Sequence, residues 1–155
     1  MKLIGNKNEF AIEYQITDTE RMRGYGKLWV QNSFYGTSKD LIFLKGYLIN
    51  LLDDILKAKP YEIDFENINK EEIFEQLQKE LNYTSKYLIS SSTFTDDFLG
   101  FKFKSKNEII LVWKLLTENN LIFDDLKDYT KSVILVRFKY DTANKIINQF
   151  KEEIK

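Results

Sequence analysis

The sequence of 155 residues contains no histidine and no cysteine, and it has a single proline. Without histidine the chain lacks the usual general base near neutral pH, the usual partner of a serine or cysteine nucleophile, and the commonest metal ligand. Without cysteine it has no disulfide, no thiolate metal site and no redox switch, which suits a reducing compartment. These absences exclude the familiar catalytic triads and zinc-dependent hydrolysis.

Long apolar runs and an excess of one charge are absent as well. Nowhere do about 18 uninterrupted apolar residues occur, and the opening residues MKLIGNKNEF lack the apolar run of a signal peptide, so we expect a cytoplasmic protein with no membrane partner. Lys and Arg number 23 against 24 Asp and Glu, which argues against a nucleic-acid partner. The composition is that of a globular chain, and the length predicts one domain, residues 1–155.

Alternating apolar residues predict that the chain opens as a β-hairpin. Residues 10–16 and 25–31 each show the period of a strand with one buried face, and the segment between them turns the chain. In the second strand Leu28 and Val30 face one way and Trp29 the other. Trp29 is therefore either covered by another element or partly exposed.

A second hairpin is predicted near the middle of the chain. Residues 99–104 alternate, a short turn follows at 105–107, and EIILVWKLL is apolar on both faces, as a central strand is. The lysines beside Phe101 and Phe103 face away from these rings, which favours a place in the core over a base-stacking surface. SVILVRFKY predicts a last strand.

Three helices are expected. TSKD, Thr37 to Asp40, has the spacing of a capping box, so the first helix should begin there and end before Pro60. Asn69 is the expected cap of the second helix and Asp141 of the third. The segment 87–97 is open between strand and loop.

This order of elements predicts the α+β class. The expected architecture is a mostly antiparallel sheet of two hairpins plus a C-terminal strand, packed against about three helices.

Adjacent carboxylates are the remaining candidates for catalysis or for Mg²⁺ binding. There are three such pairs, Asp53/Asp54, Asp96/Asp97 and Asp124/Asp125. Neighbours in sequence point to different faces of a strand and lie about 100° apart on a helix, so adjacency alone does not make a site. We therefore expect solvated charges here, with no catalytic residue, no cofactor and no metal.

Acidic loops are better suited to a protein partner with a basic surface, since opposite charge speeds the encounter of two proteins. The residues expected to bind such a partner are Glu62, Asp64, Glu66, Asp96, Asp97, Asp124, Asp125 and Asp128.

Two stretches carry a family resemblance. IGNKNEFAIEY, followed by GYGKLWVQNSFYG and a capped helix, and later DDFLGFKFKSKNEIILVWKL, are similar to the bacterial polymorphic-toxin immunity proteins of the contact-dependent growth inhibition type. The resemblance covers both hairpins and the helix between them, and nothing from Asn119 onward matches. It implies a cytoplasmic protein that binds the toxic C-terminal domain delivered by a competing cell and blocks it. The opening hairpin would then be a scaffold.

Two other functions stay open from the residues alone. The first is a non-catalytic adaptor that binds other proteins, and the second is an enzyme built on one of the aspartate pairs. Tight binding to one protein, with little affinity for its relatives, distinguishes an immunity protein from an adaptor.

Overall fold

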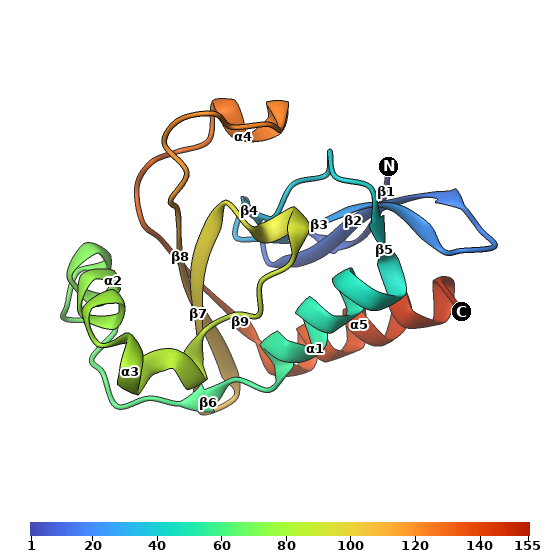
Figure 1. Cartoon of the computed structure of the whole chain (residues 1–155). Helices are drawn as coiled ribbons and strands as arrows, with labels where there is room; N and C mark the ends of the chain where they lie inside the picture. Colours follow the sequence, from blue (N-terminus) through green and yellow to red (C-terminus); the bar gives the residue numbers. More distant parts are fainter.

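Nine strands form two β-sheets in the computed structural model, which describes residues 1–155 (Figure 1). The first sheet has the order β1-β2-β3-β4, with β5 also paired to β3, and the second has the order β6-β7-β8-β9. The α+β class is confirmed, and the strands divide between two sheets. The strands are β1 (Lys2–Asn6), β2 (Phe10–Asp18), β3 (Arg23–Val30), β4 (Ser33–Tyr35), β5 (Ile42–Phe43), β6 (Lys59–Pro60), β7 (Phe98–Ser105), β8 (Glu108–Leu115) and β9 (Ile134–Lys139).

The first sheet contains the predicted hairpin, because β2 and β3 pair antiparallel along their lengths. Sequence reasoning missed β1, which pairs antiparallel with β2 at the edge of the sheet. Only Ile4 of this short strand is buried, so its sequence shows no alternation that could indicate a strand.

The second sheet contains the other predicted hairpin, formed by β7 and β8, with β9 on the far side of β8. Residues Ile109 to Trp113 of β8 are all buried, which confirms a central strand with two covered faces. Phe101 and Phe103 are fully buried, as predicted.

The helices are a π-helical turn at Leu44–Leu48 that continues into α1 (Ile49–Leu56), then α2 (Lys70–Lys79), α3 (Leu81–Thr84), α4 (Asp124–Lys127) and α5 (Tyr140–Glu153). Figure 1 shows α1 and α5 side by side, and an ion pair of 2.6 Å between Asp53 and Lys151 joins them. None of the helices is long and apolar enough to cross a membrane.

Helix starts were predicted with mixed success. Asn69 caps α2 as expected, with its side chain accepting the Glu72 amide at 2.9 Å. Thr37 does not start a helix, because its hydroxyl donates to Asp125 and the chain first adds β5 to the sheet. Asp141 does not cap α5 either but lies in its first turn. The segment 87–97 is mainly a loop, with one bridge from Leu88 to Phe101 and a 3₁₀ turn at Thr93–Thr95.

Two apolar cores hold these layers together. The larger core lies between the two sheets, α1 and α5, and contains residues such as Phe10 and Leu28 from the first sheet and Leu111 from the second. The smaller core lies on the other face of the second sheet, where α2 buries Ile73 and Leu77. Each such side chain contributes about 1.5–3 kcal/mol on burial, so the shared core determines how the two sheets sit.

An aromatic cluster joins the two sheets. Tyr35 of β4 contacts Trp113 of β8 edge to face, with the ring centroids 5.4 Å apart. The Trp113 indole N–H donates to the Tyr129 hydroxyl at 2.8 Å, and this hydroxyl donates to the Phe34 carbonyl at 2.5 Å. Tyr129 thus satisfies a buried indole of one sheet and a carbonyl of the other at the same time.

Alkaline pH should destabilise the fold through these phenols. Burial raises the pKa of Tyr35 and of Tyr129 above the ordinary value, so above about pH 10 the unfolded chain loses protons that the folded chain keeps. The stability that these groups contribute is complete below that pH and is lost as the pH rises, by about 1.4 kcal/mol per pH unit for each phenol.

The measurement is urea unfolding between pH 8 and pH 11, a range set around the phenol pKa of about 10, for the natural chain and Tyr129→Phe. The variant should be less stable at pH 8 but should lose stability less steeply above pH 10. Burial lowers the pKa of Lys27, so the contribution of this lysine to stability rises with pH, opposite to that of the phenols. This contribution is the same in both chains and cancels in the comparison. Identical slopes would contradict the prediction.

Candidate protein-binding surface

The connection between β8 and β9, residues 116–133, carries the short helix α4 and little other regular structure. Long connections of this kind in a folded domain are often functional. Figure 1 shows α4 at one extremity of the molecule, above β4 and β8. Two anchors, Asp125 and Tyr129, attach this connection to the first sheet.

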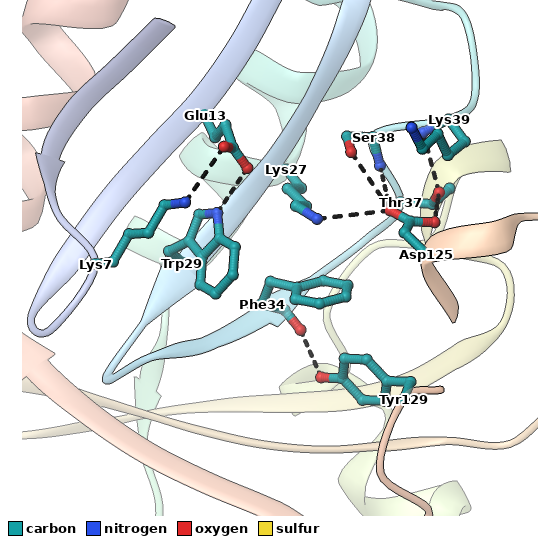
Figure 2. A network of polar contacts seen from close by, with 10 residues as sticks. All are labelled: Lys7, Glu13, Lys27, Trp29, Phe34, Thr37, Ser38, Lys39, Asp125 and Tyr129. Atoms are coloured by element: carbon teal, nitrogen blue, oxygen red, sulfur yellow. Dashed lines mark hydrogen bonds and ion pairs between the residues drawn. The ribbon is translucent and has the colours of Figure 1, made fainter. Parts of the chain in front are cut away.

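The outer face of the first sheet forms the floor on which the connection rests. Glu13 lies opposite Lys27 in the register of β2 and β3, and Trp29 lies opposite Phe34 in that of β3 and β4 (Figure 2). The Trp29 indole donates to Glu13 at 2.9 Å, and the Lys7 ammonium lies 4.2 Å from the Trp29 ring centre. Trp29 is therefore partly exposed, and Glu13 and Lys7 cover the rest of its ring. Of the two alternatives that the sequence left open, partial exposure is the one observed.

Lys27 is buried in this face although it is a lysine. Its ammonium lies 3.8 Å from the centre of the Phe34 ring and 3.6 Å from an Asp125 carboxylate oxygen. Burial lowers the pKa of Lys27, while Asp125 and Glu13 favour the charged form. A buried ammonium needs such partners, because an unpaired buried charge is costly.

Asp125 is the first anchor of the connection. One carboxylate oxygen accepts the Thr37 hydroxyl at 2.6 Å, and the other accepts the Ser38 amide at 3.0 Å and faces Lys27 (Figure 2). The Thr37 oxygen in turn accepts the Lys39 amide at 3.1 Å. The carboxylate thus ties α4 to the turn that follows β4.

Glu13 extends the network toward the opening turn of the chain. Burial would raise its pKa, but the hydrogen bonds from Trp29 and Lys7 together with the charges of Lys7 and Lys27 outweigh burial, so the pKa of Glu13 lies below its ordinary value. The carboxylate is therefore ionised at neutral pH.

Tyr129 is the second anchor. In addition to its two hydrogen bonds, its ring contacts Phe34 at 4.8 Å and Phe98 at 5.2 Å between centroids. The connection is therefore held within α4 by Asp125 and just after α4 by Tyr129, and Asp128 lies between the anchors.

Between β8 and the first anchor the connection exposes apolar side chains. Ile122 is 82% exposed and Leu116 is 42% exposed, whereas the neighbouring Leu121 and Phe123 pack against the core. A loop that is already ordered loses less entropy when it binds a partner than a mobile loop does. We call Leu116, Glu118, Ile122, Asp124 and Asp128 the α4 surface.

The structure gives the predicted acidic residues of this region different environments. Asp124 is exposed and pairs with Lys127 at 2.8 Å. Asp128 is exposed as well, but Asp125 is largely enclosed by its partners. Two of the three are thus available to a partner, and Asp125 has a structural task that sequence reasoning did not foresee.

Asp96 and Asp97 lie at the same end of the second sheet. The Asp97 carbonyl accepts the Leu116 amide at 2.8 Å, and Phe98 contacts the Tyr129 ring. Asp96 is exposed and accepts the Ser91 hydroxyl at 3.2 Å. These carboxylates therefore belong to the end of the molecule that carries the α4 surface.

Glu62, Asp64 and Glu66 lie at the opposite end of that sheet, beyond the β7–β8 turn. Glu66 approaches Arg137, which also approaches Glu108 at the start of β8. Asp64 organises its own loop by accepting the amides of Glu66 and Asn67, and hydrogen bonds from Asn67 hold the pKa of Asp64 below its usual range. The predicted acidic set is therefore divided between two ends of the protein.

Two of the adjacent carboxylate pairs are split between separate partners. Asp53 pairs with Lys151 at 2.6 Å, and Asp54 pairs with Lys102 at 3.0 Å. Asp124 and Asp125 likewise contact different groups. No cluster of three or more carboxylates that could hold a metal ion occurs in the structure.

Sequence reasoning missed Ile122, Lys27 and Tyr129. Ile122 follows the point beyond which the resemblance offered no match, and its only signal was an isolated apolar triplet, LIF, before two aspartates. Nothing in the sequence pairs Lys27 with Asp125, because the two residues meet only in the folded chain.

Comparison with known proteins identifies the class. The crystal structure of CdiI from Burkholderia dolosa AUO158 is similar over 98% of this chain and 99% of that chain, with a TM-score of 0.62 and 10% sequence identity, and so shows a shared fold. The model of the immunity protein 42 family matches residues 1–153. The chain therefore belongs to the immunity protein 42 family, which confirms the resemblance and extends it past Asn119. No curated protein sequence matches the chain.

The two aspartates of α4 allow a matched test of the anchors. Asp125→Asn leaves the Lys27 ammonium without its nearest carboxylate and should cost about 2 kcal/mol of unfolding free energy, the size expected for hydrogen bonds to a charged group. It should also raise hydrogen exchange across residues 117–131, measured by mass spectrometry. Asp124→Asn is the control, because Asp124 is exposed, and it should leave both measurements unchanged. Equal effects of the two variants would contradict the anchoring role of Asp125.

Proposed function

We propose that this protein neutralises a cognate bacterial toxin by binding the toxin's C-terminal domain in the cytoplasm and blocking its active site or an adjacent surface. Membership of the immunity protein 42 family supports this proposal. The likeness in fold to CdiI of Burkholderia dolosa agrees with a role in contact-dependent growth inhibition. Residues 1–155 act as a single domain in this proposal.

The observation that carries the choice of surface is Ile122. An isoleucine exposed to 82% on a loop held by a buried ion pair has no role in the core of this chain. Apolar residues at the centre of an interface, surrounded by polar groups that exclude water, supply much of the binding energy. Ile122 has this setting, with Glu118, Asp124 and Asp128 on the same connection.

The charge of these neighbours indicates the chemistry of the partner. Glu118, Asp124 and Asp128 are exposed, and Asp96 lies at the same end of the molecule. A toxin that cuts nucleic acid has a basic substrate groove, which carboxylates can occupy in place of phosphates and which opposite charge helps them to find. We therefore favour a toxin domain with a basic surface around an apolar pocket.

The test requires the cognate toxin domain, which we expect to be encoded next to the gene of this protein. Ile122→Glu places a charge where the apolar contact is proposed and should weaken binding by about 2 kcal/mol, or about 30-fold in Kd. The melting temperature should stay constant, since the side chain is exposed. Isothermal titration calorimetry gives the Kd, and survival of cells that express the toxin gives neutralisation.

Tyr83→Ala is the matched control, because Tyr83 is exposed to 81% on α3, away from the α4 surface. It should bind and protect like the natural chain. If Ile122→Glu binds the toxin with full affinity, the interface lies elsewhere on the protein. Weak binding of the natural chain to several unrelated proteins would favour an adaptor instead.

A further inference from the structure

A second exposed apolar patch lies where β5 leads into α1. Phe43 is 48% exposed and Tyr47 is 38% exposed, and their ring centroids are 6.4 Å apart. Leu41 beside them is 39% exposed. Figure 1 shows β5 and α1 on a different side of the molecule from α4, so this patch is separate from the α4 surface.

Arg23 lies within this patch and has no ionic partner. It is opposite Phe43 in the register of β3 and β5, and its guanidinium carbon is 5.4 Å from the centre of the Phe43 ring. None of the nine ion pairs of the structure includes Arg23. Its Nε is buried and makes no hydrogen bond, so a carboxylate from another molecule would have to bind the terminal nitrogens of the guanidinium. A guanidinium with free donors above an aromatic ring suits a carboxylate, which it can bind through two parallel hydrogen bonds.

The charged residues near Arg23 form no ion pair with its guanidinium. Asp18 lies opposite it across β2 and β3 but accepts the Arg21 backbone amide at 3.0 Å. Glu20 is exposed on the intervening turn, and Arg21 and Lys45 add two exposed cations around the patch. None of these carboxylates forms an ion pair with Arg23, so a carboxylate from another molecule can do so.

The backbone holds this patch in shape. The Leu44 amide donates to the Met22 carbonyl at 3.0 Å, which ties the start of the π-helical turn Leu44–Leu48 to the residue just before β3. π-Helical turns are rare in proteins, and those that occur often lie at functional sites. Here the turn carries Tyr47 to the rim of a hollow of about 470 Å³ between α1 and Ser90–Ser92, which gives an extended segment a path away from the patch.

We propose that Arg23, Phe43 and Tyr47 form a second protein-binding site, which takes a segment of a partner protein that carries a carboxylate beside apolar side chains. The carboxylate binds the Arg23 guanidinium, and the apolar side chains cover the two rings. Arginine and aromatic residues are the types enriched at the centre of protein interfaces. This site is independent of toxin neutralisation by the α4 surface.

The experiment follows backbone amide shifts of the full chain by NMR as a synthetic peptide of glutamates and leucines is added. We expect shifts at residues 21–24 and 41–47 that saturate. The same peptide with glutamine in place of glutamate should bind about tenfold more weakly, because it cannot form the charged hydrogen bonds. Phe43→Ala should weaken binding similarly, whereas Tyr83→Ala and Ile122→Glu should leave it unchanged.

Arg23→Gln tests the guanidinium directly, and the glutamine peptide does so without altering the protein if that variant does not fold. Absence of saturable shifts in the patch would overturn the proposal, and so would equal binding of the two peptides. A single-stranded oligonucleotide that shifts the same amides and displaces the peptide would also overturn it, since the site would then be one for nucleic acid.

Discussion

The hydroxyl of Tyr129 is the polar link between the two sheets that the shared apolar core packs together. It accepts the indole N–H of Trp113 from one sheet and donates to the carbonyl of Phe34 in the other. The buried indole would otherwise lack a partner, and a buried unpaired donor costs more than an ordinary hydrogen bond gains. Because Tyr129 belongs to the β8–β9 connection, the same bonds that join the sheets also place the loop that we assign to toxin binding.

Asp125 and Lys27 apply the same principle to charge. Each ion is removed from water, so each needs the other together with the hydroxyl of Thr37 and the amide of Ser38. The result is a loop that is anchored to the first sheet while Ile122 stays exposed. In the function that we propose, the enclosed aspartate maintains the shape of the loop and the exposed residues contact the toxin.

Local pattern was sufficient for the elements whose partners lie nearby in the chain. The alternation in β2, β3, β7 and β8 predicted both hairpins, and Asn69 predicted the start of α2, because each signal requires only a neighbouring strand or turn. Thr37 failed as a helix start for the opposite reason. Its hydroxyl has the right spacing for a capping box, but Asp125, 88 positions further along, takes it instead.

The sequence by itself determined the α+β class, the two hairpins, the buried faces of the central strand and the absence of histidine and cysteine chemistry, because composition and periodicity act locally. Only the tertiary structure decided that the strands form two sheets, that Asp125 is an anchor while Asp124 is exposed, and that Arg23 has no partner. Those outcomes depend on which distant groups compete for the same hydrogen bonds and charges, and that competition takes place only once the chain has folded.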